Sequence, residues 1–83
     1  MYKIVISPRA RRELKQIAKL YRRVSIELIE ELKDNPYLGK QLTRELTGKY
    51  SCRVGVYRMI YKIDKVDKKI YILSAGHRGT VYQ

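Results

Sequence analysis

Short apolar runs in the second half of the chain restrict the fold more than any other feature of the sequence. The segments from Tyr50 to Ile63 and from Lys69 to Ala75 are rich in β-branched and aromatic residues, and glycines or polar turns bound them. Such runs are typical of β-strands that bury one face. Arg53 and Arg58 interrupt the first run, and a buried unpaired guanidinium is costly. The face of the sheet that carries the arginines should therefore be exposed to solvent or bind a ligand.

The first half of the chain has helical periodicity after a short strand at residues 2–6. Ser7 can cap a helix, and Pro8 fits the first helical position. Apolar residues then recur at helical spacing to Tyr21 among many basic residues, and a second apolar stripe runs through residues 22–34 among acidic ones. We expect two helices that meet near residues 21–23, because one continuous helix would overhang a chain of this size.

The remaining elements complete a β-α-α-β-β-β order. Residues 35–48 read as a loop, and strands are expected at residues 50–54, 56–63 and 69–75. With 83 residues the chain is long enough for one small domain, which we place at residues 1–83. The expected class is α+β, with a two-helix hairpin packed on one face of a mainly antiparallel sheet.

The hairpin at Gly55 and Val56 predicts which side chains share a face. If these two residues form a tight turn, Val54 pairs with Tyr57 and Arg53 pairs with Arg58. Strand alternation then turns Cys52 toward the helices, where it packs as a small apolar residue.

The register of the next hairpin is predicted from the apolar pattern. Aligning Tyr57, Met59 and Tyr61 with Ala75, Leu73 and Tyr71 keeps one face apolar. This register places Arg58 opposite Ser74, with Ile60, Ile70 and Ile72 on the arginine face. Arg78 would lie further along on the same side. Three arginines on one face without nearby acids indicate a site for an anionic ligand, although each alone could extend along a half-exposed surface.

The charge balance favours a polyanion as partner. The chain has 19 lysines and arginines against 8 acids, for a net charge of +11, and nucleic acid is the leading candidate. The single cysteine supports neither a disulfide framework nor a structural metal site, so no cofactor is expected. The apolar stretch at the N-terminus is too short for a signal peptide, and no run approaches the ~20 residues of a membrane span. We expect a cytoplasmic protein that does not enter a membrane.

The two arginine-containing segments resemble the RelE/ParE toxin superfamily, and more specifically its RelE-like branch. The resemblance rests on the run YSCRVGVYRMIY at residues 50–61 and on GHRGTVY at residues 76–82. The Ser-Pro-Arg-Ala helix start and the Asn35-Pro36 loop with Gly39 extend it over nearly the whole chain. The resemblance implies a type II toxin that cleaves mRNA in the ribosomal A site and is silenced by a cognate RelB-like antitoxin.

The resemblance also implies roles for individual residues. Arg58 matches an arginine that stabilises the phosphate, Arg78 one placed near the leaving oxygen, and Tyr82 a tyrosine that orients the substrate. Two lysines of the family's catalytic set correspond to Ser51 and Arg53, and neither residue here is an ordinary general base. His77 is the first acid/base candidate, and Lys49 is the second. Arg53 and Lys49 are also expected to bind the substrate.

Two other functions fit the same residues. A ParE-like protein would inhibit DNA gyrase without cutting RNA. A non-catalytic basic module would bind nucleic acid or ribosomes through charge alone, with an affinity that falls steeply with salt.

Overall fold

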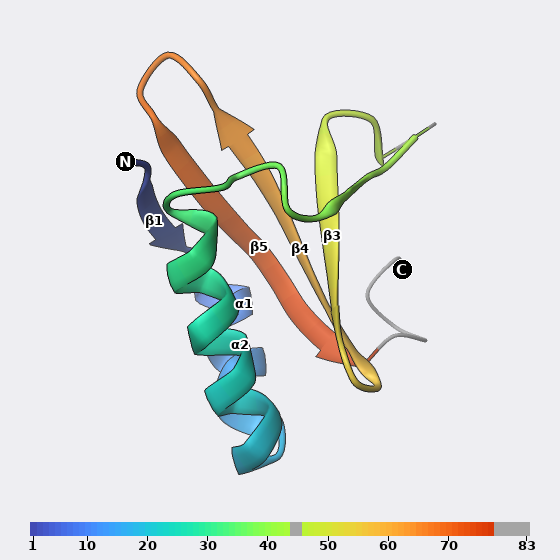
Figure 1. Cartoon of the computed structure of the whole chain (residues 1–83). Coiled ribbons are helices and arrows are strands. Elements are labelled where there is room, and N and C mark those ends of the chain that lie inside the picture. Colours follow the sequence, from blue (N-terminus) through green and yellow to red (C-terminus); the bar gives the residue numbers. More distant parts are fainter. Residues whose placement is uncertain (44–45, 78–83) are drawn as a thin grey trace.

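A computed structural model describes residues 1–43 and 46–77 of the chain. Its elements are β1 (Lys3–Ile6), α1 (Pro8–Gln16), α2 (Lys19–Leu32), β2 (Lys40–Gln41), β3 (Lys49–Val54), β4 (Tyr57–Asp64) and β5 (Lys69–His77). The five strands form one sheet in the order β1-β5-β4-β3-β2, in which only the β1–β5 pair is parallel. Both helices lie on one side of this sheet (Figure 1). The predicted α+β class with a helical hairpin is confirmed.

The core lies between the helices and the sheet. Apolar side chains of α1 and α2 meet a row of fully buried strand residues, as the periodicity predicted for Met59 and Tyr61. Cys52 also packs in this cluster, as expected. The members of the cluster are Ala10, Leu14, Ile17, Ile29, Leu32, Cys52, Met59, Tyr61, Ile70, Ile72 and Ala75.

The start of α1 is hydrogen-bonded to β5 beyond the end of β1. The Ser7 hydroxyl accepts from Ala10 N and donates to Leu73 O, both at 3.0 Å. One turn later Glu13 Oε1 accepts from Ala75 N at 3.0 Å. Since β1 ends at Ile6, these side chains satisfy backbone groups of β5 that would otherwise lack a strand partner.

A bulge at Leu73 makes the predicted register between β4 and β5 wrong. The pairing is Arg58 with Gly76, instead of Ser74, and it shifts between Ile60 and Tyr61 so that Tyr61 faces Ile72. Because of this extra residue, every β5 side chain before Leu73 points to the face opposite to the one predicted.

The reversal exchanges the two faces at the far end of β5. Ile70 and Ile72 lie fully buried in the core, instead of on the arginine face. Tyr71, which the sequence pattern turned toward the helices, instead pairs with Lys62 on the opposite face. The apolar pattern alone could not reveal the bulge, because both alignments keep an apolar row on the helical side.

The break between the helices lies at Ile17 and Ala18, earlier than the predicted position near residues 21–23. The Arg22 guanidinium turns back from α2 and donates to the carbonyl oxygens of Leu14, Lys15 and Ile17 at 2.9, 2.6 and 3.2 Å. A side chain from the second helix thus satisfies the last carbonyls of the first, so no glycine is needed there.

The segment expected to be loop contains the short edge strand β2. Tyr61 fixes the approach to this strand, because its hydroxyl donates to Pro36 O at 2.8 Å and accepts from Gly39 N at 2.9 Å. Gly39 is crowded, since a Cβ there would lie 2.7 Å from the Tyr61 hydroxyl and 2.9 Å from Cys52 Sγ. Lys40 then pairs with Ser51 across the sheet edge.

Within residues 1–43 and 46–77, neither helix has the length and apolar character that crossing a membrane would demand.

Replacing Tyr61 by Phe should destabilise the fold in a pH-dependent way. Two backbone groups would lose their partner, at a cost of about 1–3 kcal/mol in the free energy of unfolding. Burial raises the pKa of Tyr61, so its contribution is complete below the unfolded value of about 10 and declines as the pH rises above it. Urea unfolding at neutral pH and above pH 10 should show a larger alkaline loss for the wild type than for Tyr61→Phe. Equal alkaline losses of unfolding free energy in the two proteins would contradict this prediction. Tyr37→Phe, which removes the hydroxyl of an exposed tyrosine, serves as the control.

Candidate functional site

The sheet face opposite the helices carries the candidate site. Register places Arg53, Arg58 and Gly76 in one row across β3, β4 and β5. The predicted turn at Gly55 and the predicted pairing of the two arginines are both confirmed. Arg53 is exposed and Arg58 is half-buried. Two guanidiniums directly opposed on neighbouring strands repel each other, and an anion bound between them would relieve the repulsion.

The turn next to this pair is held by two tyrosines. Gly55 adopts a φ of 61°, and an added Cβ there would collide with the ring of Tyr21 from α2. The Tyr21 ring also lies 5.4 Å from that of Tyr57, centroid to centroid. The second helix therefore supports the hairpin that presents the arginines, so the pair stands on a packed base.

Lys40 is a site candidate that the sequence pattern missed. It lies on β2 opposite Ser51, and cross-strand partners present their side chains on the same face. Ser51 is two residues from Arg53, about 7 Å along the strand. The exposed Lys40 thus lies in the row next to the arginine row. It brings a positive charge to the place where Ser51 has none. A two-residue strand leaves almost no signal in a sequence, so the sequence pattern does not single out Lys40.

Lys49 lies on the same face but farther from the arginines. It pairs with Lys62, four residues from Arg53 and so about 13 Å along the strand. The structure therefore brings Lys40 closer to the arginine row than the reserve candidate Lys49.

The remaining predicted site residues lie at or beyond the end of β5. The backbone of His77 pairs with Tyr57. Arg78 and Tyr82 lie outside the described residues, so their predicted roles stay predictions.

Cys52 behaves as a core residue in its ionisation as well as its packing. Burial raises the pKa of its thiol, which keeps it protonated and weakly nucleophilic near neutral pH. Among the described residues, no three His, Cys, Asp or Glu side chains come together in a way that could hold a metal ion.

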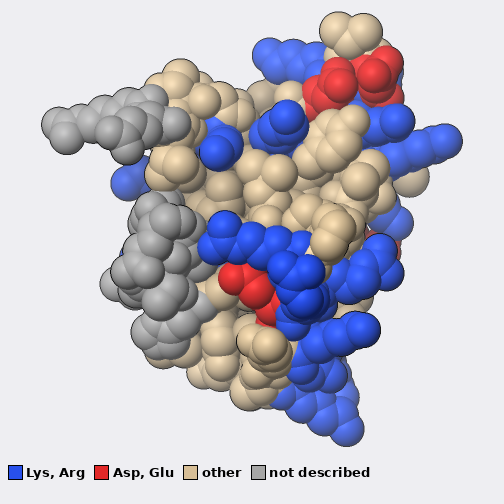
Figure 2. All heavy atoms as spheres, turned by 180° about the vertical axis from the view of Figure 1, so that it is seen from behind, with Lys and Arg blue, Asp and Glu red and all other residues tan. Residues whose placement is uncertain are grey.

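Positive charge extends well beyond the arginine row. Figure 2 views the molecule from behind and shows lysine and arginine side chains spread over that face, while the acids gather in small separate patches. A surface of this kind attracts polyanions from a distance, in a manner that salt weakens.

The arrangement of two helices on one side of a mainly antiparallel sheet is also found in solved structures of toxins. The model of the ParE toxin of type II toxin-antitoxin systems matches residues 4–82, and the chain belongs to this family.

Its relatives are RelE-like toxins. The chain is 36% identical to toxin RelG of Mycobacterium tuberculosis, with 99% of this chain and 97% of the relative covered. It is 31% identical to toxin RelE of the same organism, over 99% and 87% of the two chains. A chain in the crystal structure of the toxin-antitoxin complex RelBE2 from that organism superposes with a TM-score of 0.83 at 34% identity, over 93% of this chain and 98% of the other. The resemblance to RelE-like toxins is thus confirmed.

Replacing Arg53 by Gln should stabilise the fold at low salt. Removing one of two opposed charges should raise the free energy of unfolding by about 0.2–1 kcal/mol. The gain should shrink toward 1 M salt, where the screening length falls to about 3 Å. Arg23→Gln, on the exposed surface of α2, is the matched control and should change little. Destabilisation by Arg53→Gln at low salt would show that the pair is not repulsive.

Proposed function

We propose that the chain is a ribosome-dependent endoribonuclease that cleaves mRNA in the ribosomal A site. The observation that carries this proposal is the row of Arg53 and Arg58 on the sheet face opposite the helices, with Lys40 beside it. The net charge of +11 and the RelE-like relatives support the same function. Work on ribosomes would place the protein in the cytoplasm.

The proposed reaction is an internal transfer at phosphorus. The ribose 2′-oxygen loses its proton and bonds to the adjacent phosphorus while the bond to the 5′-oxygen breaks. The products are a 2′,3′-cyclic phosphate and a 5′-hydroxyl, which takes up a proton. Negative charge grows on the phosphorane oxygens, so fixed cations that meet it there lower the barrier.

Arg58 is the residue best placed to stabilise that charge. It lies in the middle of the arginine row, with Arg53 on one neighbouring strand and the Gly76 backbone on the other. Arg53 and Lys49 would hold the substrate backbone, and Arg78 and Tyr82 would act at the leaving oxygen and the substrate base.

Lys40 would supply, from the neighbouring strand, the positive charge that the Ser51 side chain lacks. An exposed lysine with three rotatable donors suits a phosphate as a point charge. His77 remains the candidate for proton transfer, because imidazole is the side chain that ordinarily titrates near neutral pH. Positioning of the substrate by the ribosome would provide much of the remaining acceleration.

A cognate antitoxin is the expected protein partner. The related structure from M. tuberculosis is a toxin-antitoxin complex. Leu20, Val24 and Ile26 on α2 are exposed large apolar residues. An amphipathic segment of a RelB-like antitoxin could cover them, as helices commonly do when they bind in apolar grooves.

Gyrase inhibition is a second candidate function, because the matching family model is described as a ParE toxin. A DNA supercoiling assay with purified gyrase separates the two. Inhibited supercoiling with intact mRNA would favour the second candidate. A purely electrostatic module would instead respond about equally to the loss of any surface lysine or arginine.

Arg58→Ala should abolish most mRNA cleavage while the fold is kept. Loss of one donor to the developing charge typically lowers the rate by about 10²–10³-fold. The measurement is primer extension on a message translated by purified ribosomes, with Arg23→Ala on α2 as a matched arginine control. Intact message with the wild-type protein would refute the proposed function, and full activity of Arg58→Ala would refute the role of Arg58.

Lys40→Gln should lower cleavage about tenfold or more, since a hydrogen bond to a charged group contributes about 1.5–3 kcal/mol. Lys40→Arg keeps the charge and should retain most of the activity. The same primer-extension assay applies, and Lys15→Gln on the exposed side of α1 is the control. Equal activities of Lys40→Gln and the wild type would remove Lys40 from the site.

A further inference from the structure

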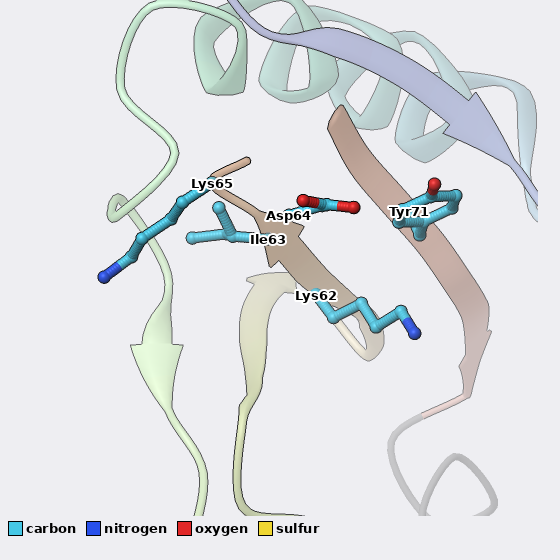
Figure 3. Close-up of a pocket in the computed structure, with 5 residues that line it drawn as sticks. All are labelled: Lys62, Ile63, Asp64, Lys65 and Tyr71. Atoms are coloured by element: carbon cyan, nitrogen blue, oxygen red, sulfur yellow. The ribbon is translucent and has the colours of Figure 1, made fainter. Parts of the chain in front are cut away.

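A concavity lies on the arginine face at the end of the sheet away from the arginines, where β4 turns into β5. Its volume is about 490 Å³, and it is lined by Lys62, Ile63, Asp64, Lys65 and Tyr71. Figure 3 shows Lys62, Asp64 and Tyr71 around it, while the Lys65 side chain points away. None of these residues belongs to the arginine row described above.

Tyr71 gives this concavity an aromatic surface. The bulge at Leu73 brings Tyr71 onto the outer face, where it pairs with Lys62. The Lys62 ammonium lies 5.4 Å from the centroid of the Tyr71 ring, within cation-π range. A half-exposed ring beside a cation can bind a nucleotide, because the base can stack on the ring and the phosphate can meet the ammonium.

The single acid in the concavity does not cancel its positive charge. Asp64 Oδ1 accepts from Val66 N and Asp67 N, both at 3.0 Å, which fixes the carboxylate in the turn. Asp64 pairs with Lys69, and Lys69 pairs with Lys3 on β1. Lysines therefore outnumber the acid around the concavity, and a fixed carboxylate can accept hydrogen from the amino group of a base.

The concavity lies on the same face of β4 as the arginine row, with the buried Ile60 between them. Lys62 is four residues from Arg58 on the same strand and the same face, a separation of about 13 Å. Lys49 lies opposite Lys62 and extends the positive charge toward β3. A polynucleotide with one phosphate at Arg58 would reach Tyr71 within a few nucleotides.

We propose that the concavity binds one nucleotide of a single-stranded RNA, at a distance from the phosphate that is cleaved. The base stacks on Tyr71, and Lys62 contacts its phosphate. An acidic peptide would satisfy the lysines but would leave the aromatic ring without a planar partner, so RNA is the better fit. The inference rests on the proposed function, since it assigns a further subsite to the same substrate.

Binding of an RNA that cannot be cleaved tests the subsite. The probe is a fluorescein-labelled single strand of mixed sequence with 2′-O-methyl riboses, titrated with the protein and followed by fluorescence anisotropy at several salt concentrations. Tyr71→Ala should raise the Kd at least about fivefold, the effect of losing one stacked base. Tyr71→Phe keeps the ring and should bind within twofold of the wild type. Lys62→Ala should weaken binding and reduce the salt slope by about one.

Controls separate stacking from general charge and from misfolding. Lys15→Ala on α1 removes the same charge far from the concavity and should weaken binding less than Lys62→Ala does. Thermal unfolding of each variant checks the fold, and the comparison of Lys62→Ala with Lys15→Ala decides the matter should Tyr71→Ala be unstable. A peptide of ten glutamates is titrated in parallel, and its binding should not depend on Tyr71.

Two results would overturn the subsite. One is RNA binding by folded Tyr71→Ala within twofold of the wild type. The other is equal weakening by Lys62→Ala and Lys15→Ala, which would indicate charge alone. Cleavage by the wild type and its loss in Arg58→Ala are measured in the ribosome assay, so the proposed function can hold while the subsite fails.

Discussion

The buried hydroxyl of Tyr61 is the interaction on which the arrangement of the sheet edge depends. It joins the chain after α2 to the middle of β4 through Pro36 O and Gly39 N. The ring stacks on that of Tyr50 at 5.5 Å, centroid to centroid. In a chain with no Phe or Trp, Tyr61 supplies the fully buried aromatic ring of the core, and its hydroxyl then needs partners. The loop that provides them leads directly into β2, which places Lys40 beside Ser51.

The features that could be predicted from the sequence are set by residues that are close together in the chain. The pairing of Arg53 with Arg58 follows from Gly55, whose positive φ suits the tight turn. The start of α1 follows from Ser7 and Pro8, and the buried face of β4 follows from alternation. Each of these features depends on residues close together in the chain, so the sequence carries a direct signal for it.

The features that could not be predicted depend on partners far away in the chain. Ser7 bonds Leu73 and Glu13 bonds Ala75, over separations of 66 and 62 residues, and these contacts accompany the bulge that sets the register of β5. The early end of α1 depends on Arg22 reaching back from α2. β2 has too few residues to leave a periodic pattern. In each case a side chain satisfies backbone groups of another element, which apolar periodicity does not report.

The bulge also determines what kind of surface the outer face can be. In an unbroken ladder, Tyr71 would face the helices and the isoleucines of β5 would lie among the cations. One extra residue at Leu73 buries Ile70 and Ile72 and turns Tyr71 outward instead. The same irregularity thus completes the core and adds an aromatic ring to the outer face, beside Lys62. Positive charge alone binds any polyanion, whereas an aromatic ring beside that charge favours an unstacked base over a duplex or an acidic peptide.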